Sequence, residues 1–335
     1  MKIILDAMGG DNAPLEIVKG AALAVDELDV ELILVGDENK INGIIDENNL
    51  NLPKKNIEII HTDKTISMED DPISVVKSNK DSSMGVCFRM LADDKNNEIN
   101  AMVSAGNTGA LVTGSTLIIK RINDIKRPAL AMVLPFERKT LLIDVGANPD
   151  IKAEYLKQYG FIGSIYMKKI FGIETPTVGL ANIGAEKTKG TQEHVEAYKL
   201  LSETKTINFV GNVEGREIPT KCSDVLVTDG FTGNIILKMT EGFGSFMFNK
   251  LKTMFFRDIF TKISAALLKD SLREFKKSLD PSEYGGTPFL GVRRPVIKAH
   301  GSSDAKSIKN AIRQAKFCVD AKLVEEIEIQ SRINK

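Results

Sequence analysis

Residues 1–36, MKIILDAMGGDNAPLEIVKGAALAVDELDVELILVG, contain the pattern from which the fold is predicted. The apolar run 2–8 predicts a strand, and the turn GGDNAP predicts the start of a helix, with Asp11 or Asn12 as its N-cap. The run 30–36 is almost continuously apolar, as in a parallel strand covered on both faces. Between the two runs, apolar residues recur at helical spacing: Leu15, Ile17, Val18, Ala21, Ala22, Val25 and Leu28.

The same alternation continues along the chain, which predicts an α/β fold with a mostly parallel sheet. Helical stretches are expected at Thr191–Ser202 and Asn234–Lys252. Further strands are expected at Asn56–Ile60, Asn100–Val103, Leu141–Val145, Thr177–Ile183, Ile207–Val210 and Asp224–Thr228.

Length and charge limit the classes of protein. The 335 residues suggest two domains of roughly 150 residues each. The 45 basic and 45 acidic residues cancel, so the net charge offers no argument for a nucleic-acid partner. The three cysteines are far apart and form no CxxC pair, which predicts reduced cysteines in a cytosolic protein: Cys87, Cys222 and Cys318.

No targeting or membrane-spanning segment is expected. Met1–Leu5 leads directly into Asp6, unlike a secretory signal. The uncharged run Ala101–Ile119 contains three glycines and six polar residues, so it is too polar for a transmembrane helix.

Most of the expected strands are followed by loops rich in Gly, Asn and Asp. In parallel sheets, ligands bind outside the carboxyl ends of the strands, so these loops are expected to converge on one crevice. The loops are DAMGGD at 6–11, SAGNTG at 104–109, DVGAN at 144–148, NIGAEKTKG at 182–190, GNVEGRE at 211–217 and TDGFTGN at 228–234.

The loop SAGNTG is a candidate anion cradle. Gly106 and Gly109 allow the backbone to approach a ligand closely, while Ser104, Asn107 and Thr108 add neutral donors. A tight strand-to-helix turn with an N-cap is the alternative interpretation.

Charged and titratable residues follow several of these strands. Lys187 and Lys189 could point into the crevice or remain solvated on their loop. Asp229 ends a strand, and Asn234 is either a site residue or a helix N-cap.

The histidines are few. His300, in VIKAHGSSDAK, could donate a proton to a phosphate or to a leaving group near neutral pH. His61 could face the crevice, and His194 is expected at the surface. Three histidines make a multi-histidine metal site improbable, and no GxSxG, HExxH or Walker A pattern occurs. DAMGGD lacks the GxGxxG spacing, and its Asp11 would repel a pyrophosphate, so no nicotinamide site is expected.

Residues 250–280 carry no strand pattern and predict a pair of amphipathic, locally basic helices. The segment contains eight Lys or Arg and four Asp or Glu. Phe256 and Phe260 lie beside a single apolar stripe, formed by Leu251, Phe255, Ile259, Ile263 and Leu267.

Taken in order, the motifs resemble those of the PlsX family, the acyl-carrier-protein:phosphate acyltransferases of bacterial lipid synthesis. The series extends from Asp6 to Ser303, and its NKDSSM stretch departs from the family's KKDSSM at Asn79 only. The motifs are DAMGGDNAP, SAGNTGAL, DVGAN, NIGAEKTKG, GNVEGRE, VTDGFTGN, EYGGTPFLG and IKAHGSS.

The resemblance implies two α/β domains of the isocitrate- and isopropylmalate-dehydrogenase-like, phosphotransacetylase-like type, with a cleft between them and a projecting helix pair. We expect residues 1–148 with 300–335 in one domain, and 149–299, including the helix pair 250–280, in the other. The implied assembly is a homodimer that is cytoplasmic, is peripherally associated with the membrane surface, and needs neither cofactor nor metal.

The implied reaction moves an acyl chain from the thioester of acyl carrier protein onto inorganic phosphate. A membrane glycerol-3-phosphate acyltransferase of the PlsY type would then use the acyl phosphate. Phosphate is already a nucleophile, so direct attack needs positioning and charge balance rather than an acyl-enzyme. The leaving thiol has a pKa of about 8.5 by analogy with cysteine, so help with its protonation is useful but modest.

The resemblance also implies roles for individual residues. Lys189 would offset the charge of phosphate, and His300 would assist phosphate or the thiol. The phosphate-binding set is Ser104, Gly106, Asn107, Thr108 and Gly109, with Asp229 and Asn234 as further catalytic residues. The remaining cleft residues are Asp6, Gly9, Gly10, Asp11, Asn182, Asn212 and Ser302.

The helix pair has two interpretations that can coexist, a dimer core and a membrane contact. The expected membrane residues are Phe255, Phe256, Ile259, Phe260 and Leu268. Charge complementarity makes four nearby basic residues candidates for contact with the acidic carrier protein: Arg257, Lys262, Lys269 and Arg273. The alternatives to this function are a phosphotransacetylase-like enzyme that uses acyl-CoA and a non-catalytic membrane-docking protein.

Overall fold

The computed structural model describes most of the chain. The described residues are 1–53, 55–93, 98–134, 136, 138–221, 223–278 and 285–333. Cys222, the residues Glu283 and Tyr284 of the EYGGTPFLG motif, and the last two residues of the expected 250–280 segment lie outside them.

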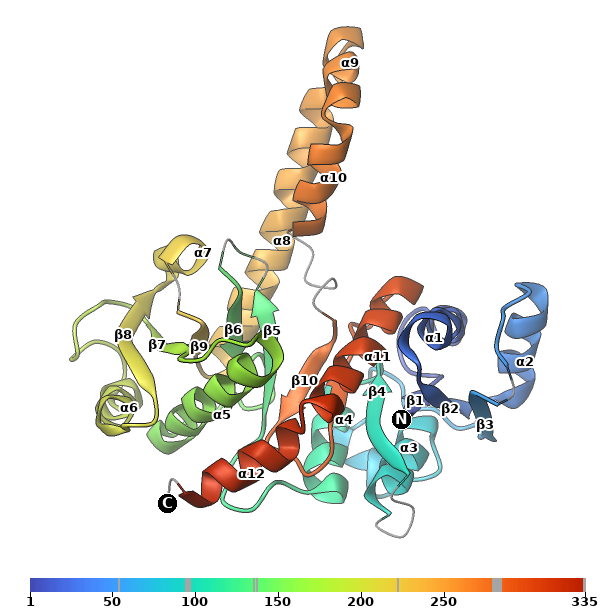
Figure 1. Ribbon diagram of the computed structural model, residues 1–335, viewed down its shortest axis with the longest axis horizontal. Helices are drawn as coiled ribbons and strands as arrows, with labels where there is room; N and C mark the ends of the chain where they lie inside the picture. The colour runs from blue at the N-terminus through green and yellow to red at the C-terminus, as the bar shows by residue number, and fades with distance from the viewer. Residues whose placement is uncertain are drawn as a thin grey trace.

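One continuous eleven-stranded sheet runs through the described part of the chain (Figure 1). Its central pairs, β5–β6, β5–β10 and β10–β11, are antiparallel, and the pairs on both wings are parallel. In spatial order the strands are β3 (Ile57–His61), β2 (Glu31–Gly36), β1 (Lys2–Asp6), β4 (Ile99–Ser104), β11 (Val296–Lys298), β10 (Thr287–Leu290), β5 (Ala129–Leu134), β6 (Thr140–Ile143), β9 (Val225–Val227), β7 (Thr177–Asn182) and β8 (Asn208–Glu214).

The predicted α/β fold with a mostly parallel sheet is confirmed, and each predicted strand overlaps an observed one. The sequence analysis missed β5, β10 and β11. Strands β10 and β11 have only four and three residues, too few to show a period. They also pair with residues far away in the chain, such as Val296 with Met102, and no local pattern records such a pairing.

The sheet is continuous across the expected domain boundaries. Strand β6 pairs with β9, and β11 pairs with β4, so each half contains a strand that was expected in the other. The division into 1–148 with 300–335 and 149–299 stays a prediction.

Helices cover both faces of the sheet. Along β1, Ile3 and Leu5 belong to one buried cluster and Ile4 to the other, because successive side chains of a strand point to opposite faces. The first cluster contains residues of α1 (Leu15–Leu28), α5 (Ala153–Phe171), α6 (Gln192–Glu203), α11 (Ala305–Asp320) and α12 (Leu323–Ile333), and the second those of α3 (Ser83–Ala92) and α4 (Thr108–Gly114).

Close packing of α1 against α11 depends on Gly20. A Cβ at this position would lie 2.5 Å from Cβ of Ile308. The remaining short elements are α2 (Glu38–Glu47), α7 (Ile218–Lys221), the 3-10 turns Pro72–Val75 and Gly215–Glu217, and a π-helical turn, Ser115–Ile119, that continues α4.

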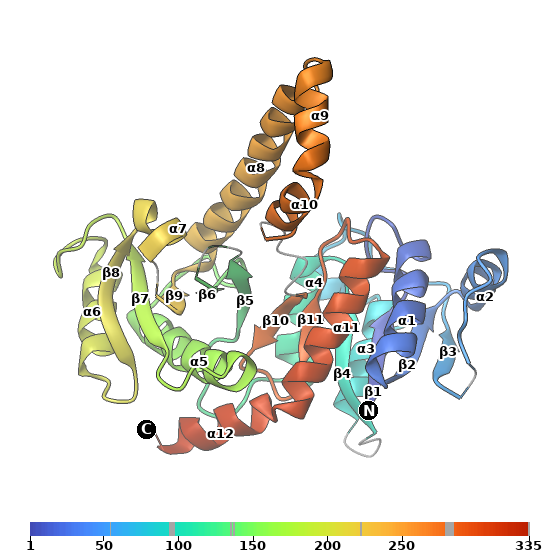
Figure 2. The ribbon, with the colours of Figure 1, turned by 45° about the horizontal axis from the view of Figure 1, so that its top comes forward.

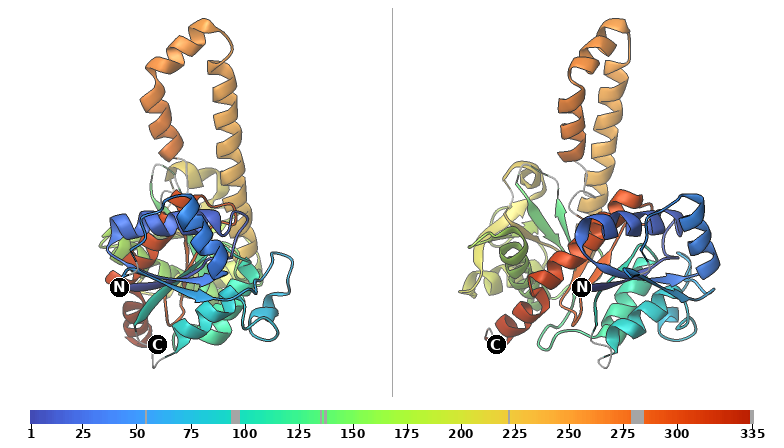
Figure 3. Two further views of the ribbon diagram at one scale, coloured as in Figure 1. Left: turned by 90° about the vertical axis from the view of Figure 1, so that its right-hand side faces the viewer. Right: turned by 45° about the vertical axis from the view of Figure 1, so that its right-hand side comes forward.

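An arm of three helices projects from the body, as Figures 2 and 3 show. It consists of α8 (Gly230–Phe255), α9 (Ile259–Leu267) and α10 (Lys269–Ser278). The predicted projecting helices are confirmed, but the boundary near residue 250 is wrong, because α8 is a single helix of 26 residues from the sheet to the tip. No proline interrupts its hydrogen bonds there. None of the helices in the described ranges combines the length and apolarity needed to cross a bilayer.

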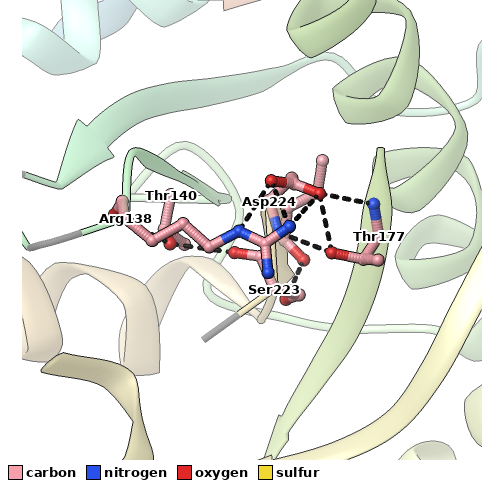
Figure 4. A network of polar contacts seen from close by, with 6 residues as sticks. Arg138, Thr140, Thr177, Ser223 and Asp224 are labelled. Atoms are coloured by element: carbon pink, nitrogen blue, oxygen red, sulfur yellow. Dashed lines mark hydrogen bonds and ion pairs between the residues drawn. The ribbon is translucent and has the colours of Figure 1, made fainter. Parts of the chain in front are cut away.

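A polar network around the buried carboxylate of Asp224 ties three strands of the second wing together (Figure 4). Asp224, at the start of β9, accepts hydrogen bonds from Nε and Nη2 of Arg138 at 2.8 and 2.7 Å. The same carboxylate accepts from the backbone N–H and the hydroxyl of Thr177, both at 2.7 Å. Thr140 donates to the carbonyl of Ser223 at 2.8 Å, so the starts of β6, β7 and β9 are joined.

Asp224→Ala is expected to lower the free energy of unfolding by about 3 kcal/mol, because four hydrogen bonds to a buried carboxylate are lost and the partly buried N–H and hydroxyl of Thr177 are left without their acceptor. Urea unfolding at neutral pH measures the change. Asp320→Ala removes the partner of Lys316 in an exposed ion pair and is expected to cost less than about 1 kcal/mol. Equal losses in the two variants would contradict the structural role of Asp224.

Candidate active site

A cavity of about 880 Å³ lies between the centre of the sheet, the loops that follow β4, β6 and β11, and α8. Four of the six loops expected to converge reach it, through Asp11, Thr108, Val145 and Asn234, and the loop after β11, which was not expected, reaches it as well. The residues used below that line it are Asp11, Met68, Thr108, Leu130, Met132, Val145, Asn234, Leu237, Lys238, Glu241, Phe248, Lys298, His300, Ser302 and Asp304.

One face of α8 forms a wall of the cavity. Its lining residues recur every three or four positions, from Asn234 through Leu237, Lys238 and Glu241 to Phe248. Asp229 caps this helix, because its Oδ1 accepts from the backbone N–H of Thr232 at 2.7 Å. The N-cap interpretation of Asn234 is therefore wrong: Asn234 lies in the second turn and faces the cavity, whereas Asp229 is occupied with the cap.

The side chains of Ser104 and Asn107 build the turn after β4. Oγ of Ser104 donates to Oδ2 of Asp6 at 2.7 Å and accepts from the N–H of Gly106 at 3.0 Å. Oδ1 of Asn107 caps α4 by accepting from Ala110, and its amide donates to the carbonyls of residues 67 and 68. Among the expected phosphate-binding side chains, Thr108 is the one that lines the cavity.

The glycines of the loops after β1 and β4 allow these loops to pack on each other. A Cβ on Gly9 would overlap the carboxylate of Asp6 and lie 2.8 Å from the backbone nitrogen of Gly106. Gly10 has a φ of 110°, a backbone conformation that side chains disfavour. The N–H of Asp11 donates to the carbonyl of Gly301 at 2.8 Å, which joins the loop after β1 to the loop that carries His300.

Two buried carboxylates, those of Asp6 and Asp144, accept hydrogen bonds from the segments that follow or end β4 and β6. Burial raises the pKa of Asp6, and its Oδ1 has no hydrogen-bond partner among the described residues. Burial also raises the pKa of Asp144, although its oxygens accept from the backbone N–H groups of Gly146, Ala147 and Asn148 at 2.8 to 3.1 Å. Asp144 therefore fixes the shape of the DVGAN loop beside Asn234.

His300 lines the cavity, and its side chain is exposed. Its Nδ1 accepts from the backbone N–H of Ser302 at 3.3 Å and lies 2.9 Å from the Ser302 hydroxyl. Nε2 lies 3.4 Å from Nζ of Lys238, which itself pairs with Glu241 at 2.8 Å. Burial and then the charge of Lys238 lower the pKa of His300, so the ring is neutral at pH 7 and can accept a proton.

The structure places Lys189, Asn182 and Asn212 in a different group, at the ends of β7 and β8. The amide of Asn182 donates to the carbonyl of Lys189 at 3.1 Å, and the amide of Asn212 donates to the carbonyl of Glu186 at 2.9 Å. Lys189 is exposed and is not among the cavity-lining residues. Their expected part in the site stays a prediction.

His61 also lies away from the cavity lining, where its Nδ1 accepts from the N–H of Glu38 at 3.3 Å. Within the described ranges, no group of three His, Cys, Asp or Glu side chains is placed to hold a metal ion.

The sequence analysis missed Lys298, the last residue of β11. Its side chain is 9% exposed, lines the cavity, and donates to the carbonyls of Ala105 and Ala299. Burial lowers the pKa of Lys298 to about 8. The motif IKAHGSS contains this lysine, but nothing in the local pattern distinguishes it from a solvated one.

Solved structures with a similar fold support the expected phosphotransacetylase-like architecture. A phosphotransacetylase from Streptococcus pyogenes superposes with a TM-score of 0.63 at 16% identity, over 97% of this chain and 94% of that one. A 4-hydroxythreonine-4-phosphate dehydrogenase from Klebsiella pneumoniae gives 0.54 at 14% identity, over 94% of this chain and 98% of that one. At these identities the likeness concerns the fold alone.

Relatives in sequence are much closer. A "Phosphate acyltransferase" of Alkaliphilus oremlandii is 48% identical over 98% of this chain and 96% of its own length. Another with that name, from Thermoanaerobacter pseudethanolicus, is 44% identical over 99% and 98%. The model of the "Fatty acid synthesis protein" family matches residues 1–326. With a match of this length and with these relatives, the chain belongs to that family, the PlsX-type phosphate acyltransferases.

Proposed function

We propose that this protein transfers the acyl group of acyl-[acyl carrier protein] to inorganic phosphate, which yields acyl phosphate and the free carrier protein. Besides family membership, the cavity supports this reaction, because both polar and apolar side chains line it. Thr108, His300, Ser302 and Lys298 offer polar groups. Leu130, Met132, Leu237 and Phe248 offer apolar surface suited to an acyl chain.

In the proposed step, an oxygen of phosphate attacks the thioester carbon, the C–S bond breaks, and the sulfur leaves. The proton of hydrogen phosphate passes to neutral His300 and then to the departing thiolate, so the step is balanced. No acyl-enzyme forms, because phosphate is itself the nucleophile and the protein supplies position and charge. Thr108 and the backbone of the 104–109 turn hold phosphate, and Lys189 from the β7 loop remains a candidate for offsetting its charge.

The test is an assay of acyl phosphate formation, trapped with hydroxylamine, from acyl carrier protein thioesters and from acyl-CoA. We expect formation that depends on phosphate and a higher kcat/KM with the carrier protein. Preference for short acyl-CoA would favour the phosphotransacetylase-like alternative. A burst of free carrier protein in the absence of phosphate would show an acyl-enzyme and overturn direct attack.

We also propose a homodimer in which the arm takes part. An exposed apolar stripe follows α8 on a face other than the one that lines the cavity. It consists of Phe231, Ile235, Met239, Phe243 and Phe246, and a face of this size is suited to packing against a second copy. Light scattering after size-exclusion chromatography tests this, and a monomer at micromolar concentration would contradict it.

The tip of the arm is the proposed membrane contact. Phe256, Ile259 and Phe260 are 59%, 64% and 78% exposed, Leu268 at the other end of α9 is exposed too, and Phe255 is half-buried. A cytoplasmic protein that touches the membrane with this tip could hand its apolar product to a PlsY-type acyltransferase without releasing it into water.

Phe256→Asp combined with Phe260→Asp is expected to weaken binding to anionic phospholipid vesicles at least about tenfold, since two large apolar side chains no longer enter the interface. Vesicle co-sedimentation measures the bound fraction. The control is Leu23→Asp combined with Ile329→Asp, two exposed apolar residues of the body. Unchanged binding in the tip variant would rule out this contact.

The four basic residues of the arm, Arg257, Lys262, Lys269 and Arg273, remain candidates for docking the acidic carrier protein. All four are exposed. Affinity for the carrier protein should then fall as salt rises, and an affinity independent of salt would count against this docking site.

A further inference from the structure

Lys298 holds a positive charge beside the expected phosphate turn. It ends β11, next to β4 in the sheet, and its Nζ donates to the carbonyl of Ala105 at 3.1 Å and to that of Ala299. Ala105 belongs to the turn 104–109, and Ala299 precedes His300. The ammonium group is therefore fixed between the phosphate turn and the loop of the proposed proton carrier.

The charges around the cavity single out this lysine. Lys238 also lines the cavity, but it pairs with Glu241 at 2.8 Å. Within the described residues, no carboxylate lies within ion-pair distance of Nζ of Lys298. A phosphate ion that enters the cavity needs a compensating positive charge, since an uncompensated buried anion is costly.

The protonation state of Lys298 suits this task. Burial lowers its pKa to about 8, and the nearby carboxylates of Asp6 and Asp11 act in the opposite direction. The side chain is therefore mostly charged at pH 7. An ammonium has three N–H donors, and two of them serve the carbonyls, so one remains for an oxygen of a ligand.

We propose that Lys298 binds the phosphate nucleophile and fixes it against the 104–109 turn, a role that rests on the phosphate acyltransferase function proposed above. Lys189, in contrast, is not among the cavity-lining residues of the same chain. The competing explanation is that Lys298 merely braces two loops by satisfying their carbonyls.

The experiment compares the wild type with Lys298→Met, Lys298→Arg, Lys189→Ala and the control Lys316→Met, whose lysine pairs with Asp320 on the surface. We expect Lys298→Met to raise the KM for phosphate by about 10- to 100-fold, the effect of one lost charged hydrogen bond. The KM for the acyl donor should change less than about twofold because the donor does not depend on this contact. Lys298→Arg should restore part of the phosphate affinity, and Lys316→Met should match the wild type.

The pH dependence of kcat/KM for phosphate distinguishes a lysine that binds phosphate by its charge from one that only holds two loops together. The wild-type kcat/KM for phosphate should fall as pH rises through about 8, the pKa of Lys298, because the ammonium loses its proton. Lys298→Arg should lack this fall, since a guanidinium stays protonated.

Direct calorimetric titration with inorganic phosphate tests the inference apart from catalysis. If the wild type makes no acyl phosphate yet binds phosphate, and Lys298→Met does not, the proposed function fails while the inference holds. A purely structural role would give a different result. Lys298→Met would only lower Tm or fail to fold, and Lys298→Arg would keep both the wild-type KM for phosphate and the fall in kcat/KM near pH 8. That outcome would overturn the inference. A raised phosphate KM in Lys189→Ala alone would likewise assign the role to Lys189 and overturn it.

Discussion

Replacing His300 by alanine is expected to lower kcat for acyl phosphate formation by about 100-fold, the lower end of general acid–base effects. Ser302 holds the ring through Nδ1, and the ring is neutral at pH 7 because burial lowers its pKa. It can therefore take the proton of phosphate and deliver it to sulfur. Steady-state rates with saturating carrier thioester and phosphate measure the loss.

His61→Ala is the matched control, because this histidine interacts with the backbone of Glu38 and is not among the residues that line the cavity. Its kcat should stay within about twofold of the wild type, as expected for a side chain away from the chemistry. If His300→Ala keeps the wild-type kcat between pH 6 and 9, the proton carrier is another group.

Gly233→Ala is expected to lower the free energy of unfolding by about 3 kcal/mol, at the upper end of overpacking costs. Gly233 lies in the first turn of α8, where an added Cβ would overlap the carbonyl oxygen of Asp144 and lie 2.9 Å from its carbonyl carbon. Both partners are backbone, so neither can rotate away. Relief requires α8 to shift, which would also move Asn234 and the wall of the cavity. Urea unfolding and the assay above measure both effects.

Gly242→Ala is the control in the same helix. A Cβ there meets no atom within 4 Å, so the substitution should stabilise the helix by about 0.5–1 kcal/mol, the usual difference between glycine and alanine. Equal stabilities of the two variants would contradict the tight contact between α8 and the DVGAN loop.

Much of the architecture follows from local patterns. The β-α-β unit of residues 1–36 and the parallel strands of both wings were predicted because each carries several apolar residues at a clear period. Of the strands in the antiparallel centre, β6 was predicted, but β5, β10 and β11 were not. Strands β10 and β11 are too short to show a period, and they are held by pairing with β4 and β5, more than 150 residues away.

The candidate site was also predicted only in part. Six Gly-, Asn- and Asp-rich loops were expected to converge, and four of them, at 6–11, 104–109, 144–148 and 228–234, do reach one cavity. Residue types did not reveal which side chains face that cavity. Ser104 and Asn107 are suitable donors, but each is already bonded to a neighbouring segment of the chain, to Asp6 and to residues 67 and 68.

Lys298 shows most clearly which features of the site could not be predicted from the sequence. It is one of 45 Lys and Arg residues, and its neighbours in the chain resemble those of any strand end. Its burial and its bond to Ala105, 193 residues away, exist only once β11 lies beside β4. Periodicity and turn chemistry are local, so they can be read from the order of residues. The desolvation of a single charged group and its hydrogen-bond partners depend on which distant segments surround it. Those segments come together only when the sheet forms.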